Sequence, residues 1–307
     1  MEPTNKQSGS KQAFTIVEIL TVMSIIVILI TLLVPSLNMA KRYAKNVRQR
    51  AQFHSIDVAL DLFNADWQGY PPSDANDETG ALYCGAMKLA EAMVGQDLLG
   101  FHPNSRFRCN GLDGAGNSLY PNDNGTPAYR ENLKSRKGPY LQLENANAYR
   151  VKHIYGRGSA IGACGEERFV LCDIYTNVTL KPANNDPVGT IIRGKSGMPI
   201  LYYKAHTANT AHDIIVPANP NNIYNYFDND ELVQLPLPWN TAVYHPMAGG
   251  THPTSSGTSD PAIFYKETWN KKIITTNRPY RSDSYILLSA GYDGEYGTPD
   301  DIFNFEE

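Results

Sequence analysis

The sequence lacks the short motifs that mark several common enzyme classes. HExxH, GxSxG and GxxxxGK[ST] do not occur, which excludes the zinc peptidases, serine hydrolases and P-loop nucleotide-binding proteins that depend on them. The glycines of segment 156–162 have the wrong spacing for a dinucleotide fingerprint. Among seven scattered histidines, His206 and His212 could approach each other, although isolated histidines are more often core or surface residues. We therefore predict that the protein is not an enzyme.

Basic charge and cysteine are also scarce. The 307 residues carry a net charge of -4 at pH 7, so we predict no nucleic-acid partner. The chain has four cysteines and no CxxC, which argues against a cysteine-based zinc site. Outside the cytoplasm four cysteines permit two disulfides. The pairing that closes the shortest loops is Cys84 with Cys109 and Cys164 with Cys172, and unpaired buried thiols are the alternative.

Long hydrophobic runs are absent with one exception. Residues 14–34 are mostly apolar and carry a single charge, Glu18, and as a helix they would span roughly 30 Å, the thickness of a bilayer core. The run is longer than the core of a signal peptide and no small-residue cleavage site follows it, so we predict a transmembrane helix. A carboxylate inside a membrane is costly. Either Glu18 reaches the interface, or it pairs with a positive charge from another chain or a new amino terminus.

The helical pattern continues beyond the apolar run. It ends before Gly69-Tyr-Pro-Pro72, which predicts one helix from about 15 to 67 with a soft point at Pro35. We expect its first half to contact other subunits and its second half, where large apolar residues widen the stripe, to face a core. The stripe comprises Leu37, Ala40, Ala44, Val47, Ala51, Ser55, Val58 and Leu62, and the widening residues are Phe53, Ile56, Leu60 and Phe63.

The remaining chain has the composition of a folded body. We predict a short helix near 86–99 and strands at 168–175, 198–204 and 285–289, with loops and short strands over 205–280. The final segment, SDSYILLSAGYDGEYGTPDDIFNFEE, places Asp293, Glu295, Asp300 and Asp301 among glycines. Crowded carboxylates repel each other unless a cation binds, and calcium takes six to eight oxygen ligands. The segment therefore predicts a calcium site, with a solvated acidic turn as the alternative.

The stretch AFTIVEILTVMSIIVILITLLVPSL resembles the amino-terminal segment of type IV pilins and type II secretion pseudopilins. In that family a prepilin peptidase removes a short basic leader just before a Phe, which is then usually N-methylated. The resemblance implies a cut between Ala13 and Phe14, although the family usually has Gly where this chain has Ala13. Glu18 is then the fifth residue from the cut and Pro35 the twenty-second, as in the family.

The resemblance also implies a layout and a fold. It predicts a leader at 1–13, a transmembrane half-helix at 14–34, an amphipathic half-helix at 35–68 and a globular body at 69–307. The fold class is α+β, the pilin fold, in which the long helix packs on an antiparallel sheet. RKGPYLQL, at 136–143, resembles the GPYL element of pseudopilins, and Asp173 followed by Gly197-Met-Pro199 resembles their aspartate and Gly-x-Pro arrangement.

The carboxyl-terminal segment resembles the SxGxDG…DDI loop of major pseudopilins, which binds calcium. Carried over to this chain, the resemblance implies that Asp293, Asp300 and the Ala290 carbonyl are the main ligands. Asp301 and Ser289 are the weaker candidates.

The implied function is that of a structural filament subunit. Such a protein is a single-pass inner-membrane protein with its body in the periplasm or in an extracellular filament. It assembles with itself and with minor pilins on an inner-membrane platform, and Glu18 would neutralise the Phe14 amine of a neighbour. We favour a type II secretion pseudopilin. A type IV pilus subunit and a membrane-tethered binding or enzymatic domain are the alternatives.

The distribution of basic residues opposes a body outside the cytoplasm. Five basic residues follow the apolar run and only two precede it, which alone would predict a cytoplasmic body. The five are Lys41, Arg42, Lys45, Arg48 and Arg50, and the two are Lys6 and Lys11.

Overall fold

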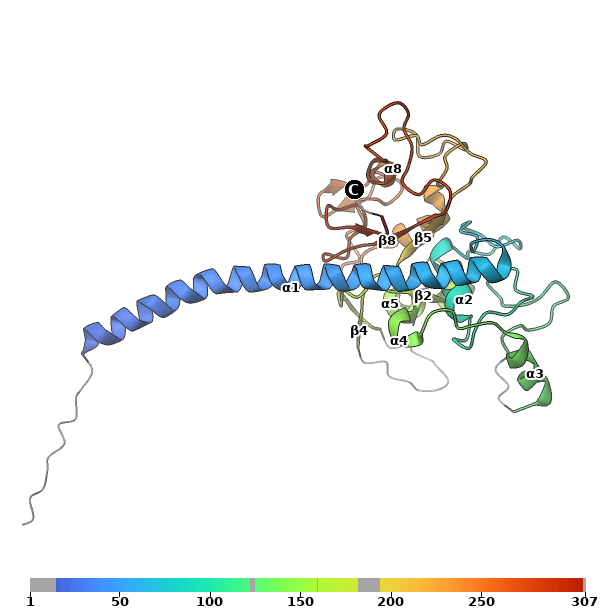
Figure 1. The fold of residues 1–307 in the computed structure, drawn as a ribbon, viewed down its shortest axis with the longest axis horizontal. Coiled ribbons are helices and arrows are strands. Elements are labelled where there is room, and N and C mark those ends of the chain that lie inside the picture. The colour runs from blue at the N-terminus through green and yellow to red at the C-terminus, as the bar shows by residue number, and fades with distance from the viewer. Residues whose placement is uncertain (1–14, 122–124, 159, 182–193, 306–307) are drawn as a thin grey trace, which may run out of the picture. The chain divides into compact units, whose positions relative to one another are not determined.

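The structure, a computed structural model, describes residues 15–121, 125–158, 160–181 and 194–305 (Figure 1). The leader, with Ala13, and Phe14 lie outside these ranges. The chain divides into two compact units, Met1–Ala44 and Lys45–Glu307, and helix α1 (Ile16–Trp67) contributes residues to both. The predicted helix from about 15 to 67 is therefore confirmed. The α+β layout is confirmed as a long amino-terminal helix and a body with small antiparallel sheets, whereas the pilin fold stays a prediction.

The first unit is helical from Ile16 onward, and all its described side chains are exposed. Pro35 lies inside α1 and the helix continues through it. Proline removes one main-chain donor and so frees a carbonyl one turn earlier. The Ser36 hydroxyl donates to the Leu32 carbonyl at 3.0 Å in the same turn, which adds a hydrogen bond where the main-chain ladder is interrupted.

The second unit adds many short elements to the end of α1. They are α2 (Gly85–Val94), α3 (Pro127–Ser135), α4 (Leu143–Ala146), β1 (Ala148–Arg150), α5 (Val151–Tyr155), α6 (Gly162–Glu166), β2 (Phe169–Leu171), β3 (Val178–Thr179), β4 (Lys195–Ser196), β5 (Leu201–Lys204), η1 (Tyr226–Asn229), α7 (Asp230–Val233), β6 (Pro253–Thr254), β7 (Gly257–Thr258), α8 (Ala262–Thr268), β8 (Tyr285–Ser289) and β9 (Ile302–Phe303).

The largest sheet in the described part of the body has the order β5-β8-β9 and is antiparallel. Leu201 pairs with Leu288, and Ser289 pairs with Ile302. All five residues of β8 are buried, as expected for a continuous apolar strand covered on both faces. The described two-stranded sheets join β1 with β2, β3 with β4, and β6 with β7.

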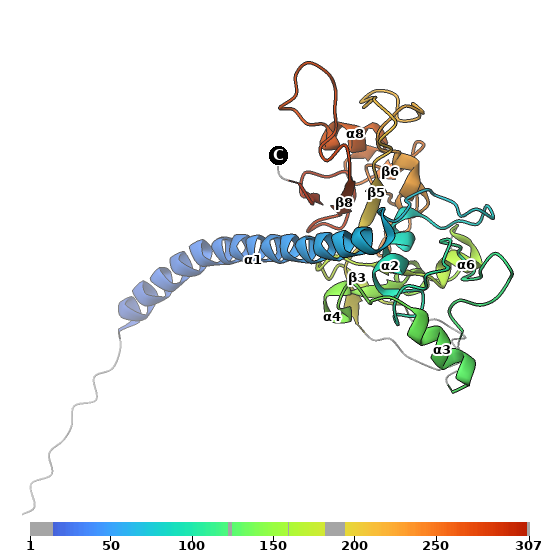
Figure 2. The same ribbon diagram turned by 45° about the vertical axis from the view of Figure 1, so that its right-hand side comes forward.

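Both faces of this sheet are buried against helices. Because side chains alternate along a strand, Tyr202 and Leu287 join the cluster that contains the inner face of α1 and most of α2. Leu201 and Ile286 join a second cluster with Phe264 of α8. In both views α8 and β8 lie on one side of the carboxyl-terminal part of α1 and α4 lies on the other (Figures 1 and 2). The sheet therefore connects the two halves of the core.

The GPYL segment contacts the end of α1. The indole nitrogen of Trp67 donates to the Tyr140 hydroxyl at 3.0 Å, and that hydroxyl donates to Asp66 at 2.7 Å. Main-chain nitrogens of Tyr140 and Leu141 donate to the Met93 carbonyl at the end of α2. This segment therefore fixes the end of α1 beside α2.

The predicted cysteine pairing is wrong. Cys109 and Cys164 form a disulfide with Cα atoms 6.1 Å apart, and Cys84 and Cys172 are free and buried. Cys84 precedes α2 and Cys172 follows β2, so both thiols lie in the core, where burial raises the pKa of Cys84 to about 12. Proximity in sequence therefore did not indicate proximity in space.

Other predicted elements are confirmed with different bounds. The helix expected near 86–99 is α2, and the strand expected at 285–289 is β8. The strands expected at 168–175 and 198–204 shorten to β2 and β5, because Cys172 and Pro199 form only an isolated bridge. The region 205–280 also contains α7 and α8, which were not predicted. These helices are too short for a recognisable period, and α8 is held by burial of Phe264 and Tyr265.

Candidate functional site

The amino-terminal end of α1 is closed by a capping box. The main-chain nitrogen and the hydroxyl of Thr15 each donate to Glu18 Oε2 at 2.8 Å, and the Glu18 nitrogen donates back to the Thr15 hydroxyl at 3.2 Å. Reciprocal bonds between an N-cap Thr and a Glu three residues later satisfy main-chain donors that a helix end leaves unpaired. The sequence reasoning missed this role, although T-x-x-E before an apolar run is its usual signature.

The polar side chains of the apolar segment satisfy their hydrogen bonds within the helix. Hydroxyls of Thr21, Ser24 and Thr31 donate to carbonyls four residues earlier, at 2.6, 2.8 and 2.7 Å. Inside a bilayer unsatisfied polar groups are costly, so this arrangement suits a membrane environment. Helix α1 is long and apolar enough to cross a membrane, and it is the candidate span found in the described chain.

Helix α1 presents two apolar faces in the second unit. Phe53, Ile56 and Leu60 are at most 2% exposed and pack in the core. By contrast, Val58 and Leu62 are about half exposed, although we expected them to face the core as well. The exposed members of the predicted stripe thus form a separate surface that the body does not cover. We call this surface the outer stripe: Val47, Ala51, Val58 and Leu62.

A buried aspartate positions the carboxyl-terminal loop. Asp173 Oδ1 accepts from the main-chain nitrogens of Tyr175 and Met198, and its Oδ2 accepts from Ser289 at 2.8 Å. A Cβ atom on Gly197 would collide with Asp173, so this close approach requires glycine. Burial raises the pKa of Asp173 to about 8. The aspartate and Gly-x-Pro elements named from the sequence therefore meet at the end of β8.

The loop after β8 brings two of the predicted calcium ligands together. Asp293 and Asp300 share a side-chain hydrogen bond. Burial, and to a smaller extent the neighbouring Asp300 carboxylate, raises the pKa of Asp293 to about 7. Asp300 also accepts from the main-chain nitrogens of Tyr292 and Asp293 at 2.7 and 3.0 Å. Gly291 has a φ of 63° and abuts the Asp300 main chain, a turn that favours glycine.

Each of the other three predicted ligands already makes a hydrogen bond, although Asp301 does so through only one of its carboxylate oxygens. Ser289 donates to Asp173, and the Ala290 carbonyl accepts from Gly294 within the turn. Asp301 accepts from the Gly297 nitrogen at 2.7 Å through Oδ2, while its Oδ1 is buried without a hydrogen-bond partner among the described residues. Asp293 and Asp300 thus fit a cation better than Ser289 does.

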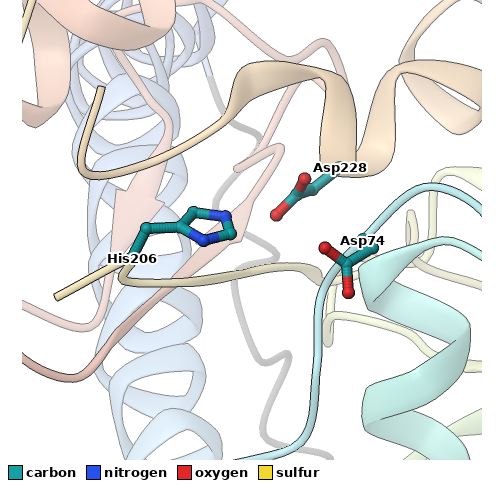
Figure 3. A group of neighbouring side chains, drawn as sticks. All are labelled: Asp74, His206 and Asp228. Atoms are coloured by element: carbon teal, nitrogen blue, oxygen red, sulfur yellow. The ribbon is translucent and has the colours of Figure 1, made fainter. Parts of the chain in front are cut away.

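A third group of side chains was not predicted. Asp74, His206 and Asp228 each offer one ligand atom, and these atoms lie within 4.8 Å of one another (Figure 3). Asp74 lies in the loop before α2, His206 follows β5, and Asp228 belongs to η1. From the sequence we considered His206 only as a possible neighbour of His212. His212 is buried, and its Nε2 lies 2.8 Å from the Tyr265 main-chain oxygen. No sequence signal joins three residues separated by 132 and 22 positions.

Comparisons with known proteins give no family assignment. No protein-family model matches the chain, and no curated protein or solved structure matches it significantly. Function must therefore be inferred from the amino-terminal motif and from the geometry described above.

Proposed function

We propose that the protein is a structural subunit of a helical pilus-like filament, anchored by α1 and cut between Ala13 and Phe14 by a prepilin peptidase. The observation that carries the proposal is the exposed apolar surface of α1. The described residues before Lys45 are all exposed, and the outer stripe continues beside a body that leaves it uncovered. Exposed apolar surface of this extent is typical of an interaction site. In a filament, neighbouring copies of α1 would bury it.

Glu18 has two roles in this proposal. In the uncut chain it caps its own helix through Thr15. After cleavage, Phe14 would carry the new ammonium group, and in a filament the Glu18 carboxylate of one copy would neutralise the amine of another. Two opposite charges are far more tolerable together than alone in a dry helical bundle. The charge pair would therefore select one axial offset between subunits.

The disulfide supports a body outside the cytoplasm. Disulfides persist in oxidising compartments and are rare in the cytosol of mesophiles. The Cys109–Cys164 bond lies within the body. It therefore outweighs the cluster of basic residues after the apolar run, which alone would predict a cytoplasmic body. The proposed location is the inner membrane, with the body in the periplasm or on an extracellular filament.

Within this class we favour a type II secretion pseudopilin, because of the GPYL element and the SAGYDG…DDI loop. A type IV pilus subunit is the second candidate. A deletion strain separates the two, because impaired protein export would support the pseudopilin and loss of surface fibres would support the pilus subunit. One observation favours a membrane-tethered domain instead. Because Glu18 already has a partner in Thr15, its presence does not require a neighbouring subunit.

The first test is the mass of the amino-terminal peptide from the protein purified from its native membrane. We expect a peptide that starts at methylated Phe14. A peptide that starts at Met1 would contradict processing and place the tethered domain first.

The second test separates the two roles of Glu18. Gln can replace Glu in a capping box, so Glu18→Gln keeps the cap and removes the charge, whereas Glu18→Ala removes both. We expect both variants to insert in the membrane and neither to form ordered filaments. Normal filaments from Glu18→Gln would show that only the cap matters and would overturn the charge pair.

The carboxyl-terminal loop completes the proposal as a calcium site. Asp293 and Asp300 would supply carboxylates, with the Ala290 carbonyl beside them, and bound calcium would replace their shared proton. A ligand that binds only the folded state stabilises it by mass action, about 2.7 kcal/mol at 100 times the dissociation constant.

We therefore expect calcium at millimolar concentration to raise the melting temperature of the full chain in detergent, and a chelator to reverse the effect. Asp293→Asn should abolish the shift, while Asp283→Asn, outside the loop, should keep it. An unchanged melting temperature in the unsubstituted protein would refute the calcium site.

A further inference from the structure

We propose that Asp74, His206 and Asp228 bind a divalent transition-metal ion, with Zn²⁺ the best match, at the edge of an asparagine-lined pocket. The proposal does not depend on the filament function. His206 follows β5 and the calcium loop follows β8, so the two sites adjoin opposite ends of this antiparallel strand pair, and they take different classes of metal.

The donor set selects the class of ion. Imidazole nitrogen and carboxylate oxygen are both common ligands of zinc, at about 2.0–2.2 Å from the metal. Calcium and magnesium prefer oxygen ligands only. Among divalent first-row metals, zinc is bound more tightly than manganese or iron by a given site of this kind. One imidazole with two carboxylates therefore favours Zn²⁺ over Ca²⁺.

The geometry leaves room for an ion between the side chains. The three ligand atoms lie within 4.8 Å of one another, and Figure 3 shows the His206 ring and the Asp228 carboxylate pointing toward each other beside Asp74. Asp74 and His206 are exposed, so small rotations can bring them closer, while Asp228 is 1% exposed and fixed. No described Lys or Arg forms an ion pair with either carboxylate.

Neighbouring residues hold the ligands as outer-shell partners do in metal sites. The Ser73 hydroxyl donates to Asp228 Oδ2 and accepts from the Lys204 main-chain nitrogen at 3.0 Å, which joins the loop before α2 to β5 and η1. The Asn225 amide donates to Asp228 Oδ1 at 2.8 Å. Each carboxylate oxygen keeps a second lone pair for a metal.

The backbones of the two exposed ligands are also fixed. Lys88, buried in α2, donates through Nζ to the main-chain oxygens of Asp74 and Asn76 at 2.7 and 2.9 Å, and not to the carboxylates. The main-chain nitrogen of His206 donates to the Ile223 carbonyl at 2.8 Å. The site is therefore positioned by main-chain bonds that do not use the ligand atoms.

The pocket beside the cluster provides the open coordination position. It has a volume of about 250 Å³, and His206 and Asn225 both contribute to its wall. The other polar side chains around it are the amides of Asn209, Asn219 and Asn222. Three protein ligands with an accessible fourth position are typical of zinc sites that accept water or another ligand. Water or a small oxygen ligand in this pocket would complete the coordination.

The test is a zinc titration of the full chain in detergent, after removal of bound metal with a chelator and dialysis. We expect one Zn²⁺ per chain, and a Co²⁺ complex whose visible absorption reports a nitrogen and oxygen environment. A tenfold excess of Ca²⁺ should not displace either metal.

Variants identify the ligands. Asp74→Asn and His206→Gln change exposed side chains, so they should fold normally, which unchanged melting of the metal-free protein would verify. Each should weaken Zn²⁺ binding at least tenfold, and the double variant should abolish it. His54→Gln, which removes an exposed histidine on α1, should bind Zn²⁺ with the same affinity as the unsubstituted chain. Unchanged affinity in the double variant, or displacement of Zn²⁺ by Ca²⁺, would overturn the site.

Discussion

At the scale of single residues, two histidines are buried in the body as neutral rings. His245 Nδ1 accepts from the Tyr296 nitrogen at 3.1 Å, and His212 contacts a main-chain carbonyl. Burial lowers the pKa of His245 to about 3 and that of His212 to about 4. In the unfolded chain both would titrate near 6.5. Between the lowered pKa values of the folded state and about pH 6.5, the folded state therefore binds fewer protons than the unfolded state.

This difference predicts loss of stability in acid. The histidine contribution is complete above about pH 6.5 and falls as the pH drops toward 4 and 3. For His245 alone, the free energy of unfolding should be lower at pH 4 than at pH 7 by about 3 kcal/mol. Denaturant unfolding of the full chain in detergent, compared at pH 7 and pH 4, measures it.

The variant His245→Asn isolates the effect, because its side-chain oxygen can accept from the Tyr296 nitrogen without titrating. We expect it to lose less stability than the unsubstituted chain between pH 7 and pH 4. His54→Asn, at an exposed position, should behave like the unsubstituted chain. Equal acid sensitivity of His245→Asn and the unsubstituted chain would contradict the prediction.

At the scale of elements, α1 separates its stability from its assembly by using two faces. Leu60 is fully buried against α2 and the sheet, while Leu62, two residues later, is 53% exposed. The same residue type thus serves a core and a free surface within one turn. This arrangement provides a matched pair of substitutions.

Leu60→Ala should lower the free energy of unfolding by roughly 2–4 kcal/mol, since it removes buried methyl groups and leaves a cavity. Leu62→Ala should change it by less than about 0.5 kcal/mol. Denaturant unfolding of the full chain in detergent measures both.

If the outer stripe is a subunit interface, Leu62→Ala should nevertheless reduce the yield or length of filaments. Filaments indistinguishable from those of the unsubstituted chain would remove Leu62 from the interface. A large loss of stability in Leu62→Ala would contradict its exposure.

At the scale of the whole molecule, the Cys109–Cys164 disulfide closes a long loop across the body, with a sequence separation of 55. A crosslink over a loop of this length stabilises the folded chain by about 4 kcal/mol in the chain-entropy model, because it restricts the unfolded state. We expect the double variant Cys109→Ala/Cys164→Ala to melt at a lower temperature than the unsubstituted protein.

Cys84→Ala provides the comparison, because this thiol is free and buried and its loss removes no crosslink. Peptide mapping without reduction should recover Cys109 joined to Cys164. A peptide that joins Cys84 to Cys109 would contradict the structure and restore the pairing by shortest loops.

The sequence by itself determined those features that depend on local periodicity. The length of α1, its apolar first half and the buried strand β8 all follow from patterns within one segment, where neighbours along the chain decide the conformation. The end of α1 before Gly69 likewise follows from local turn chemistry. The capping role of Glu18 likewise depends on a local pattern, T-x-x-E at the start of α1.

Only the tertiary structure decided which distant residues meet. The cysteine pairing, the exposure of Val58 and Leu62 and the convergence of Asp74, His206 and Asp228 depend on how separate elements pack, and no periodicity encodes that packing. Short elements such as α8 form because the core buries their aromatic side chains, since an isolated helix of that length is unstable. Local sequence thus specified the anchor and the main strand, while long-range burial specified the surfaces and sites of the body.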